Sequence, residues 1–258
     1  MNDQNLIKIW KQEEESARIR GWDFSHLDGR YAEGADIPWD YRAAVQRCLS
    51  PEMRLLDIDT GGGEFLLSLG HPYENTSATE GYPPNAALCQ ETLAPLGITF
   101  REAADVEQLP FPDESFDVII NRHGDFFPPE LFRLLKPGGI FVTQQVGAEN
   151  DRELVDLLLP GTEIPYPEQY AEKAAGRFRE AGFEVLQCRE FFGTIRFYDV
   201  GALVWFARVI PWEFPGFSVD SCRENLWKAQ EILEQQGEIR GRTHRYLLAA
   251  RKPVSTIF

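Results

Sequence analysis

The sequence predicts an α/β fold with a doubly wound, mostly parallel sheet. Residues 54–66, RLLDIDTGGGEFL, contain a short apolar run, three glycines and a second apolar run with helical spacing. A strand, a glycine turn and a helix in this succession form the first unit of such a sheet. Glycine adopts dihedral angles closed to other residues and lets a ligand approach the backbone. The turn therefore indicates a nucleotide-like ligand, with a tight turn that binds nothing as the alternative.

The second observation is that strand and helix patterns alternate after this unit. Strands are expected at 55–58, 77–80, 98–101, 116–120 and 140–146, with helices beginning at Glu64, Pro83 and Pro128. Lys136-Pro137-Gly138-Gly139 is a helix stop signal before the fifth of these strands. Such alternation implies a parallel sheet.

The third observation is a change of order after the fifth strand. Expected there are a helix at 167–181, a strand-rich segment at 183–197, helices at 199–210 and 218–236, and a last strand at 244–250. Residues 199–237, which include the aromatic loop PWEFPGF, are thus a helical insert before the last strand.

The N-terminal segment precedes the glycine-turn strand and is expected to be a separate helical extension over 1–50. An amphipathic helix at 4–20, a structured loop at 21–36 and a helix that begins near Pro38 make up this segment. Residues 51–258 form the main domain in this interpretation, and the N-terminal helices are free to cover the ligand-binding edge of its sheet.

Composition and charge exclude several classes of protein. The 258 residues carry a formal net charge of −15, which disfavours a nonspecific nucleic-acid binder because such proteins need a basic surface. The four cysteines lie far apart without a C-x-x-C pair, so no metal site is expected. Isolated thiols, no apolar signal core and no membrane-spanning stretch indicate a soluble cytoplasmic protein.

An acidic residue ends the second expected strand. Glu80 lies seventeen residues beyond Gly63. An acid near that distance commonly accepts hydrogen bonds from the ribose hydroxyls of a bound nucleotide. An exposed loop glutamate is the alternative, and the context favours the ribose role.

With these pieces placed, the chain resembles the class I S-adenosylmethionine-dependent methyltransferases. LLDIDTGGG is similar to the first motif of the family, and Glu80 matches its ribose-binding acid. Ala104-Asp105, followed by LPFPDESFD, is similar to the segment whose acid meets the adenine amino group, and LFRLLKPGGIFV is similar to the approach to the fifth strand. The resemblance covers residues 50–150 well and the tail to 252 by topology. It implies seven strands with the last antiparallel, and S-adenosyl-L-methionine as cofactor.

The resemblance also implies which residues bind the cofactor. They are Asp57, Asp59, Thr60, Gly61, Gly63, Glu80, Gly81, Tyr82, Ala104, Asp105, Val106, Asn121 and His123. One of them departs from the family, which usually has glycine at the position of Asp59. A second acid there would attract the ammonium or sulfonium group of the cofactor, whereas the lost glycine could crowd the backbone.

Methyl transfer needs alignment of three atoms and exclusion of water, but no metal. A general base is required only when the nucleophile carries a proton of high pKa. His123, just beyond the fourth strand, is the candidate catalytic base. The alternative is that His123 only lines the cofactor pocket or bonds a backbone carbonyl.

Aromatic residues in two distant segments predict a substrate lid. We expect Trp22, Trp39, Tyr41 and Trp212 to contribute to it, because a loop such as PWEFPGF cannot bury so many rings unless it packs over something. Trp205, at helical spacing among apolar residues, is expected in the core instead.

The leading interpretation is therefore a methyltransferase that acts on a small molecule or an exposed group of a larger one. A nicotinamide-dependent oxidoreductase would carry G-x-G-x-x-G, but Leu66 occupies the third glycine position. A cofactor-binding sensor without activity is a third possibility. An RNA methyltransferase is the runner-up, because basic side chains that could meet phosphates cluster near the end: Arg240, Arg242, His244, Arg245, Arg251 and Lys252. The net charge argues against RNA.

Overall fold

The computed structural model describes residues 3–19, 23–34 and 36–254. Contacts within it divide the chain into two compact units. Unit 1 comprises Met1–Ile37, Gly147–Pro167 and Phe191–Arg245, and unit 2 comprises Pro38–Val146, Glu168–Glu190 and Tyr246–Phe258. These units group residues in dense contact, and the domain boundaries expected at 1–50 and 51–258 stay a prediction.

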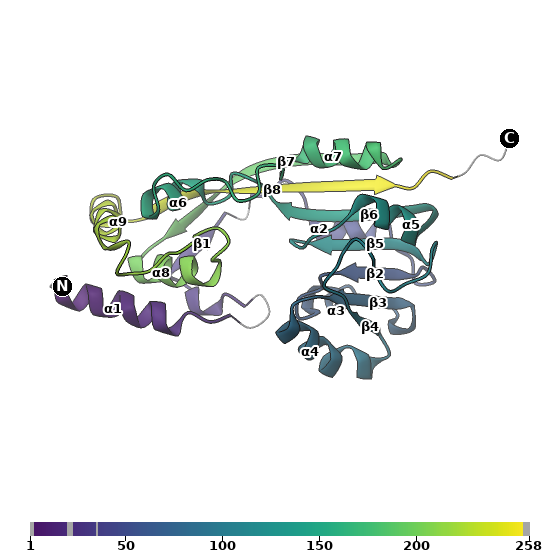
Figure 1. Ribbon diagram of the computed structural model, residues 1–258, viewed down its shortest axis with the longest axis horizontal. Helices are drawn as coiled ribbons and strands as arrows, with labels where there is room; N and C mark the ends of the chain where they lie inside the picture. Colours follow the sequence, from purple (N-terminus) through teal and green to yellow (C-terminus); the bar gives the residue numbers. More distant parts are fainter. Residues whose placement is uncertain (1–2, 20–22, 35, 255–258) are drawn as a thin grey trace. The chain divides into compact units, whose positions relative to one another are not determined.

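Unit 2 contains the predicted alternation of strands and helices (Figure 1). Its elements are α2 (Tyr41–Gln46), β2 (Leu55–Ile58), α3 (Glu64–Ser68), β3 (Thr76–Glu80), α4 (Pro83–Thr92), β4 (Thr99–Glu102), β5 (Phe116–Arg122), α5 (Pro128–Leu134), β6 (Leu135–Val146) and α7 (Ala171–Glu180). The long strands β7 (Glu184–Phe197) and β8 (Ile239–Arg251) contribute residues to both units.

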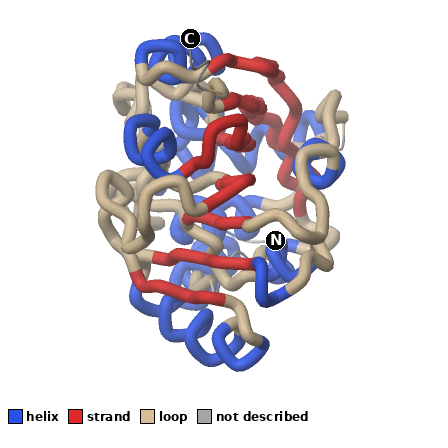
Figure 2. Tube along the Cα trace, turned by 90° about the vertical axis from the view of Figure 1, so that its right-hand side faces the viewer, coloured by secondary structure: helices blue, strands red, loops and turns tan. Residues whose placement is uncertain are grey.

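The sheet of unit 2 has the order β7-β8-β6-β5-β2-β3-β4. The pairs β6–β5, β5–β2, β2–β3 and β3–β4 are parallel. Strand β8 is antiparallel to β6, because Gly138 and Gly139 exchange backbone hydrogen bonds with Lys252 whereas Gly147 donates to His244. The predicted α/β class and the antiparallel last strand are therefore confirmed. Figure 2 shows strands of this sheet one beside another.

Side chains on both faces of the sheet are buried, which explains the continuous apolar runs in the sequence. Alternate residues along a strand enter different apolar clusters. Leu56 and Ile119 belong to one cluster with helices α5 and α7, whereas Leu55 and Val118 belong to the other with α2 and α4. Each strand is thus held from two sides, and the carboxyl ends of β2 and β5 are fixed in place.

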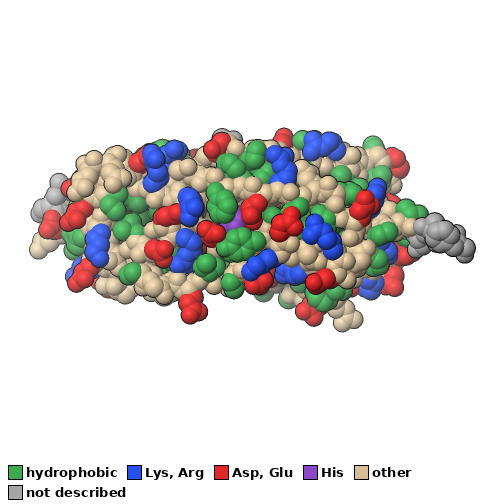
Figure 3. Space-filling model, turned by 90° about the horizontal axis from the view of Figure 1, so that it is seen from above, with side chains coloured by type: hydrophobic (Ala, Val, Ile, Leu, Met, Phe, Trp, Pro, Cys, Tyr) green, Lys and Arg blue, Asp and Glu red, His purple; other side chains and the backbone are tan. Residues whose placement is uncertain are grey.

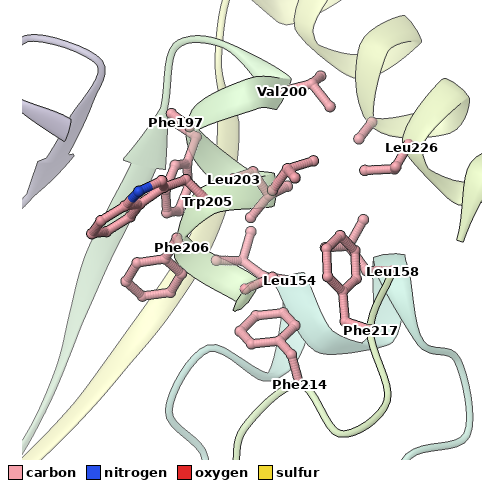
Figure 4. Packing of buried hydrophobic residues seen from close by; sticks show 14 of the residues in the cluster. Leu154, Leu158, Phe197, Val200, Leu203, Trp205, Phe206, Phe214, Phe217 and Leu226 are labelled. Atoms are coloured by element: carbon pink, nitrogen blue, oxygen red, sulfur yellow. The ribbon is translucent and has the colours of Figure 1, made fainter. Parts of the chain in front are cut away.

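Unit 1 is built around one apolar cluster (Figure 4). Its elements are α1 (Asp3–Ser16), β1 (Tyr31–Glu33), α6 (Arg152–Leu158), α8 (Val200–Val209) and α9 (Arg223–Gln236), with parts of β7 and β8. Trp205 is 2% exposed, as expected for a core residue. The ring centroids of Trp10 in α1 and Trp227 in α9 lie 4.9 Å apart, so two segments far apart in the sequence meet in this unit.

Three local expectations were wrong or incomplete. The segment at 21–36, expected to be a loop, contains β1, which pairs antiparallel with β7 and adds an eighth strand. Helix α6 was missed because it is short and begins after Asp151, which has a left-handed backbone without a capping hydrogen bond. In the PWEFPGF loop, Phe214 and Phe217 are buried in the core of unit 1 rather than lying over a ligand (Figure 4).

Unit 1 also holds a buried carboxyl group, that of Asp151, and a half-buried one, that of Glu213, beside one amide. The Nδ2 atom of Asn150 donates to Oδ2 of Asp151 at 2.7 Å and to Oε1 of Glu213 at 3.1 Å. Burial raises the pKa of Asp151 well above its ordinary value and the pKa of Glu213 to about 7, although Arg245 opposes both shifts. Oδ1 of Asp151 is buried without a hydrogen bond among the described residues.

We expect unit 1 to lose stability as the pH rises from about 5 to 8, because the folded state keeps protons on carboxyls that the unfolded state has lost. The raised pKa of Glu213 corresponds to a loss on the order of 3 kcal/mol once that carboxyl ionises. Glu213→Gln should flatten the profile. Urea unfolding followed by tryptophan fluorescence measures it, since Trp10, Trp205, Trp212 and Trp227 all lie in unit 1.

The matched control is Glu224→Gln, which removes an exposed carboxylate of the same unit. It should leave the pH profile unchanged. A Glu213→Gln profile as steep as that of the unmodified protein would contradict the assignment.

Candidate functional site

The candidate site lies where the strand order of unit 2 reverses. From β2 the chain proceeds to β3 and β4 on one side, and then returns to β5 on the other side of β2. Ligands of open parallel sheets bind outside the carboxyl ends of the strands at such a switch point. Ile58 at the end of β2 is in register with Asn121 near the end of β5. The predicted residues Asp57–Gly63 and Asn121–His123 therefore come together here.

Glu80, at the end of β3, is fixed by three backbone N–H groups. Its Oε2 accepts from Gly61 at 2.7 Å, and its Oε1 accepts from Gly81 at 2.9 Å and Tyr82 at 2.8 Å. The side chain is only 5% exposed, so it is not the exposed loop glutamate of the alternative interpretation. A carboxylate held in this way has lone pairs left to accept from a diol, and it cannot rotate away.

The glycine turn is tied to the same strand ends. The backbone N–H of Thr60 donates to the carbonyl of Thr79, and its hydroxyl donates to Oδ2 of Asp57 at 2.6 Å. Gly61 and Gly63 have φ values of 66° and 83°. A Cβ on Gly61 would meet nothing within 4 Å, so the turn has open space in front of its backbone. This is the surface that a ligand can approach.

Asp57 is buried at 3% exposure and lies behind the turn. Burial, together with the nearby charges of Asp59 and Glu80, raises its pKa to about 7, although Thr60 and Arg122 oppose the shift. Asp57 is thus a support of the turn that titrates near neutral pH. A cation bound at this place would hold it ionised.

Asp59 follows β2 in a left-handed conformation with a φ of 53°. Its Oδ2 accepts a hydrogen bond from the backbone N–H of Asp125 at 3.0 Å. A Cβ on Gly124 would lie 2.5 Å from the Cβ of Asp59, so only glycine fits there. Burial and the charge of Glu80 raise the pKa of Asp59 to about 6. The aspartate adopts a backbone conformation that favours glycine, and its side chain braces the loop after β5.

The fully buried amide of Asn121 joins three strand ends. Its Nδ2 donates to the carbonyls of Ile58 and Asp125, and its Oδ1 accepts from Nε2 of Gln145 at 2.5 Å. Gln145 also donates to the carbonyl of Gly124. Sequence reasoning missed Gln144 and Gln145, although two adjacent glutamines in an otherwise apolar strand are the signal that could have indicated them.

His123 lies on the loop that Asn121 and Asp59 hold. Its backbone N–H donates to the carbonyl of Gln144, and its Nε2 lies 3.3 Å from Nε2 of Gln144. The indole N–H of Trp39 can only donate, and it bonds Oε1 of Gln144 at 2.9 Å. The amide NH₂ group therefore faces His123 and donates to it. This arrangement selects the neutral imidazole with its proton on Nδ1.

The remaining predicted contacts lie at the ends of β3 and β4. A Cβ on Gly81 would lie 2.7 Å from Cα of Ala104 and 2.8 Å from the carbonyl oxygen of Ala103, so the two chain segments touch. Tyr82 is 63% exposed. Asp105 is exposed and caps its own turn by accepting from the N–H of Glu107, with Val106 between them.

The four residues of the predicted lid have different surroundings. Trp22 lies outside the described residues. Tyr41 in unit 2 is buried, and its hydroxyl donates to the carbonyls of Asn121 and Val142. Trp39 is half-buried in unit 2, with the guanidinium of Arg189 over its ring at 5.5 Å. Trp212 in unit 1 is 42% exposed. The role of these residues in a lid stays a prediction.

The donor and acceptor set fits S-adenosylmethionine. Glu80 offers a fixed acceptor for a ribose, the turn at Gly61 offers open backbone, and Asp57 and Asp59 favour a ligand that carries positive charge. Among the described residues, no group of three or more His, Cys, Asp or Glu side chains is placed to hold a metal ion.

A search against family models matches residues 56–143 to the methyltransferase domain. This match covers the strands and turns that carry the site just described. This part of the chain is therefore similar to a methyltransferase domain, in agreement with the resemblance found in the sequence. S-adenosylmethionine is the methyl donor that this similarity implies.

Curated relatives cover the same region. The chain is 33% identical over 136 residues to demethylmenaquinone methyltransferase from Thermus thermophilus, over 46% of this chain and 62% of the relative. It is 32% identical over 147 residues to phthiotriol/phenolphthiotriol dimycocerosates methyltransferase from Mycobacterium leprae, over 53% of this chain and 52% of that one. The chain thus spans about half to three-fifths of the length of these relatives.

Solved structures share the fold at low identity. A putative methyltransferase from Bacillus halodurans matches with a TM-score of 0.58 at 21% identity, over 86% of this chain and 100% of the other. The [4+2]-cyclase SpnF matches with a TM-score of 0.52 at 20% identity, over 83% of this chain and 80% of the other.

In the part of the chain described, none of the helices is long and apolar enough to cross a membrane.

Gly81→Ala should weaken cofactor binding about tenfold and cost on the order of 1–3 kcal/mol of stability, because the new methyl group would push apart the ends of β3 and β4. Calorimetric titration with S-adenosylmethionine and thermal unfolding measure the two effects. Gly176→Ala is the control, since a Cβ there in helix α7 would meet nothing within 4 Å. Unchanged affinity in Gly81→Ala would contradict the site.

Proposed function

We propose that this protein transfers the methyl group of S-adenosylmethionine to a small-molecule acceptor. The observation that carries the proposal is the carboxylate of Glu80, which three backbone N–H groups hold at the topological switch point. A buried carboxylate with this fixation suits the recognition of a ribose diol. We propose that the site residues named above, Asp57 to Gly63, Glu80 to Tyr82, Ala104 to Val106, and Asn121 with His123, bind the cofactor.

The bound cofactor supplies a methyl group already activated by its sulfonium. The chain has to hold the acceptor in line with this group and keep water away. Glu80 and the turn at Gly61 fix the ribose side, and Asp57 and Asp59 stabilise positive charge beside them. Asn121 keeps both strand ends in a single arrangement. We infer that this alignment, rather than a chemical step by the protein, supplies most of the rate.

His123 contributes mainly by position in this mechanism. Its Nε2 accepts from the amide of Gln144, and its Nδ1 carries the proton, so the neutral ring has no spare lone pair while this bond persists. It acts as a base only if the Gln144 bond breaks first. An acceptor with a low pKa, which reaches the site already ionised, would need no base.

The charge distribution favours a small acceptor over RNA. The basic residues near the end of the chain are engaged with acids: Arg240 with Glu238, Arg242 with Glu153, Arg245 with Glu33, Arg251 with Glu184 and Lys252 with Glu114. On the face shown in Figure 3, acidic and basic side chains are interspersed. The two relatives named above are, by their names, methyltransferases for demethylmenaquinone and for phthiotriol lipids.

We further propose that the protein works in the cytoplasm, where its thiols stay reduced. All four cysteines are free, and Cys89 is buried with its Sγ 3.1 Å from the carbonyl oxygen of Gly61. Burial and nearby carboxylates raise the pKa of this thiol to about 12, which keeps it unreactive.

Glu80→Gln should reduce affinity for S-adenosylmethionine by about tenfold or more, because an amide NH₂ would face backbone N–H groups and offer one acceptor fewer. Titration calorimetry with S-adenosylmethionine and, separately, NAD measures the effect. The control is Glu102→Gln, which changes an exposed glutamate paired with Glu80 on β4. Binding of NAD alone by the unmodified protein would overturn the proposal.

Trp212→Ala should lower methyl transfer to the acceptor about tenfold or more while leaving cofactor affinity and folding stability nearly unchanged, because this ring is 42% exposed. Formation of S-adenosylhomocysteine with a panel of quinol and phenol acceptors gives the readout. Tyr198→Ala, which removes a similarly exposed ring, is the control. Equal effects of both variants would remove Trp212 from the lid.

A further inference from the structure

The site contains one charged group that the binding of a ribose and an adenine does not require. Asp59 adopts a left-handed backbone with a φ of 53°, a conformation in which glycine would be unstrained. Its Oδ2 is used by the N–H of Asp125, and no hydrogen bond to its Oδ1 occurs among the described residues. One carboxylate oxygen of Asp59 therefore remains for a ligand.

The surroundings of Asp59 are acidic. Burial is the main cause that raises the pKa of Asp59 to about 6, and the charges of Glu80 and Asp125 act in the same direction. The hydrogen bond from the N–H of Asp125 lowers this pKa. The charges of Asp59 and Glu80 in turn raise the pKa of Asp57, whereas the charge of Arg122 lowers it. The charge of these carboxylates is thus poorly compensated by the protein itself, and a cationic ligand would relieve their repulsion.

The reaction changes the charge of the ligand. When the methyl group moves to the acceptor, the electron pair of the broken carbon–sulfur bond stays on sulfur, so the positive sulfonium becomes a neutral thioether. The new bond uses a lone pair of the acceptor, and any proton on that atom goes to solvent. S-adenosylmethionine therefore carries one positive charge more than S-adenosylhomocysteine, while the two molecules share their ribose and adenine.

We propose that Asp59 makes this site distinguish the charged methyl donor from its neutral product, so that the product is released more readily. This inference rests on the proposed function, and it assigns a specificity role to a residue that differs from the usual glycine of the family. The hydrogen bonds that Glu80 and the glycine turn offer are common to both ligands and do not separate them. An extra negative charge beside the turn does, because it attracts the sulfonium of the donor, whereas the product has an uncharged sulfur at that place.

The test compares binding rather than turnover. Affinities for S-adenosylmethionine, S-adenosylhomocysteine and sinefungin, an analogue with an amine in place of the sulfonium, are measured by calorimetry near pH 7.5. Asp59→Asn removes the charge but keeps an oxygen that can accept from Asp125. We expect Asp59→Asn to reduce the preference for S-adenosylmethionine over S-adenosylhomocysteine by roughly fivefold or more. The preference for sinefungin over S-adenosylhomocysteine should fall in parallel. Asp59→Gly should give the same result if charge rather than geometry is responsible.

The pH dependence provides an independent readout. Because the carboxyl of Asp59 becomes ionised as the pH rises through about 6, the preference for the donor should grow between about pH 5 and 7.5 in the unmodified protein. The growth should be smaller in Asp59→Asn, where Asp57 alone still titrates. The control is Glu64→Gln, which removes an exposed carboxylate next to the turn and should leave the preference unchanged.

The two proposals fail in different ways. If the unmodified protein binds none of the three ligands, the proposed function is overturned and this inference with it. If it binds them, but Asp59→Asn and Asp59→Gly keep the full preference for the donor at both ends of the pH range, only the role of Asp59 is overturned. It is then a brace for the loop after β5 and nothing more.

Discussion

The amide of Asn121 is the contact on which the geometry of the site depends. It is fully buried, and it binds the end of β2 through the carbonyl of Ile58 and the strand β6 through Gln145. A buried amide in a satisfied network is rigid, because breaking any one of its bonds leaves a polar group without a partner. The positions of Asp59, His123 and Gly124 all follow from this one group.

Much of unit 2 was predictable because its strands are buried on both faces. Continuous apolar runs such as Phe116–Ile120, bounded by turn residues, have few other interpretations. Glu80 was predictable because its distance from the glycine turn is set by one helix and one strand. The bonds that orient it were not, since they come from backbone groups that fold into place only with the turn.

The features that escaped prediction depend on long-range pairing. Strand β1 has three residues and exists because Tyr31–Glu33 pairs with a strand more than half the chain away. Gln144 and Gln145 read as ordinary polar residues until β5 brings Asn121 and His123 beside them. Phe214 looked like part of a lid because its loop is rich in aromatic residues, and only the packing of unit 1 shows that it is core.

The fold by itself leaves the reaction open, as its occurrence in a cyclase shows. The reaction has to be argued from the site, where a carboxylate fixed by backbone N–H groups and surplus negative charge lie at one strand edge. The match to the methyltransferase domain covers residues 56–143, all of which belong to unit 2.

The contact between Trp10 and Trp227 has a consequence for synthesis in the cell. Helix α1 (Asp3–Ser16) leaves the ribosome well before its partner helix α9 (Arg223–Gln236) is made. At ordinary rates of translation the interval is on the order of ten seconds or more, long compared with the folding of a helix. Throughout this interval the apolar face of α1 has no native partner from α8 or α9. The nascent chain is therefore a natural client for chaperones until helix α9 has been translated.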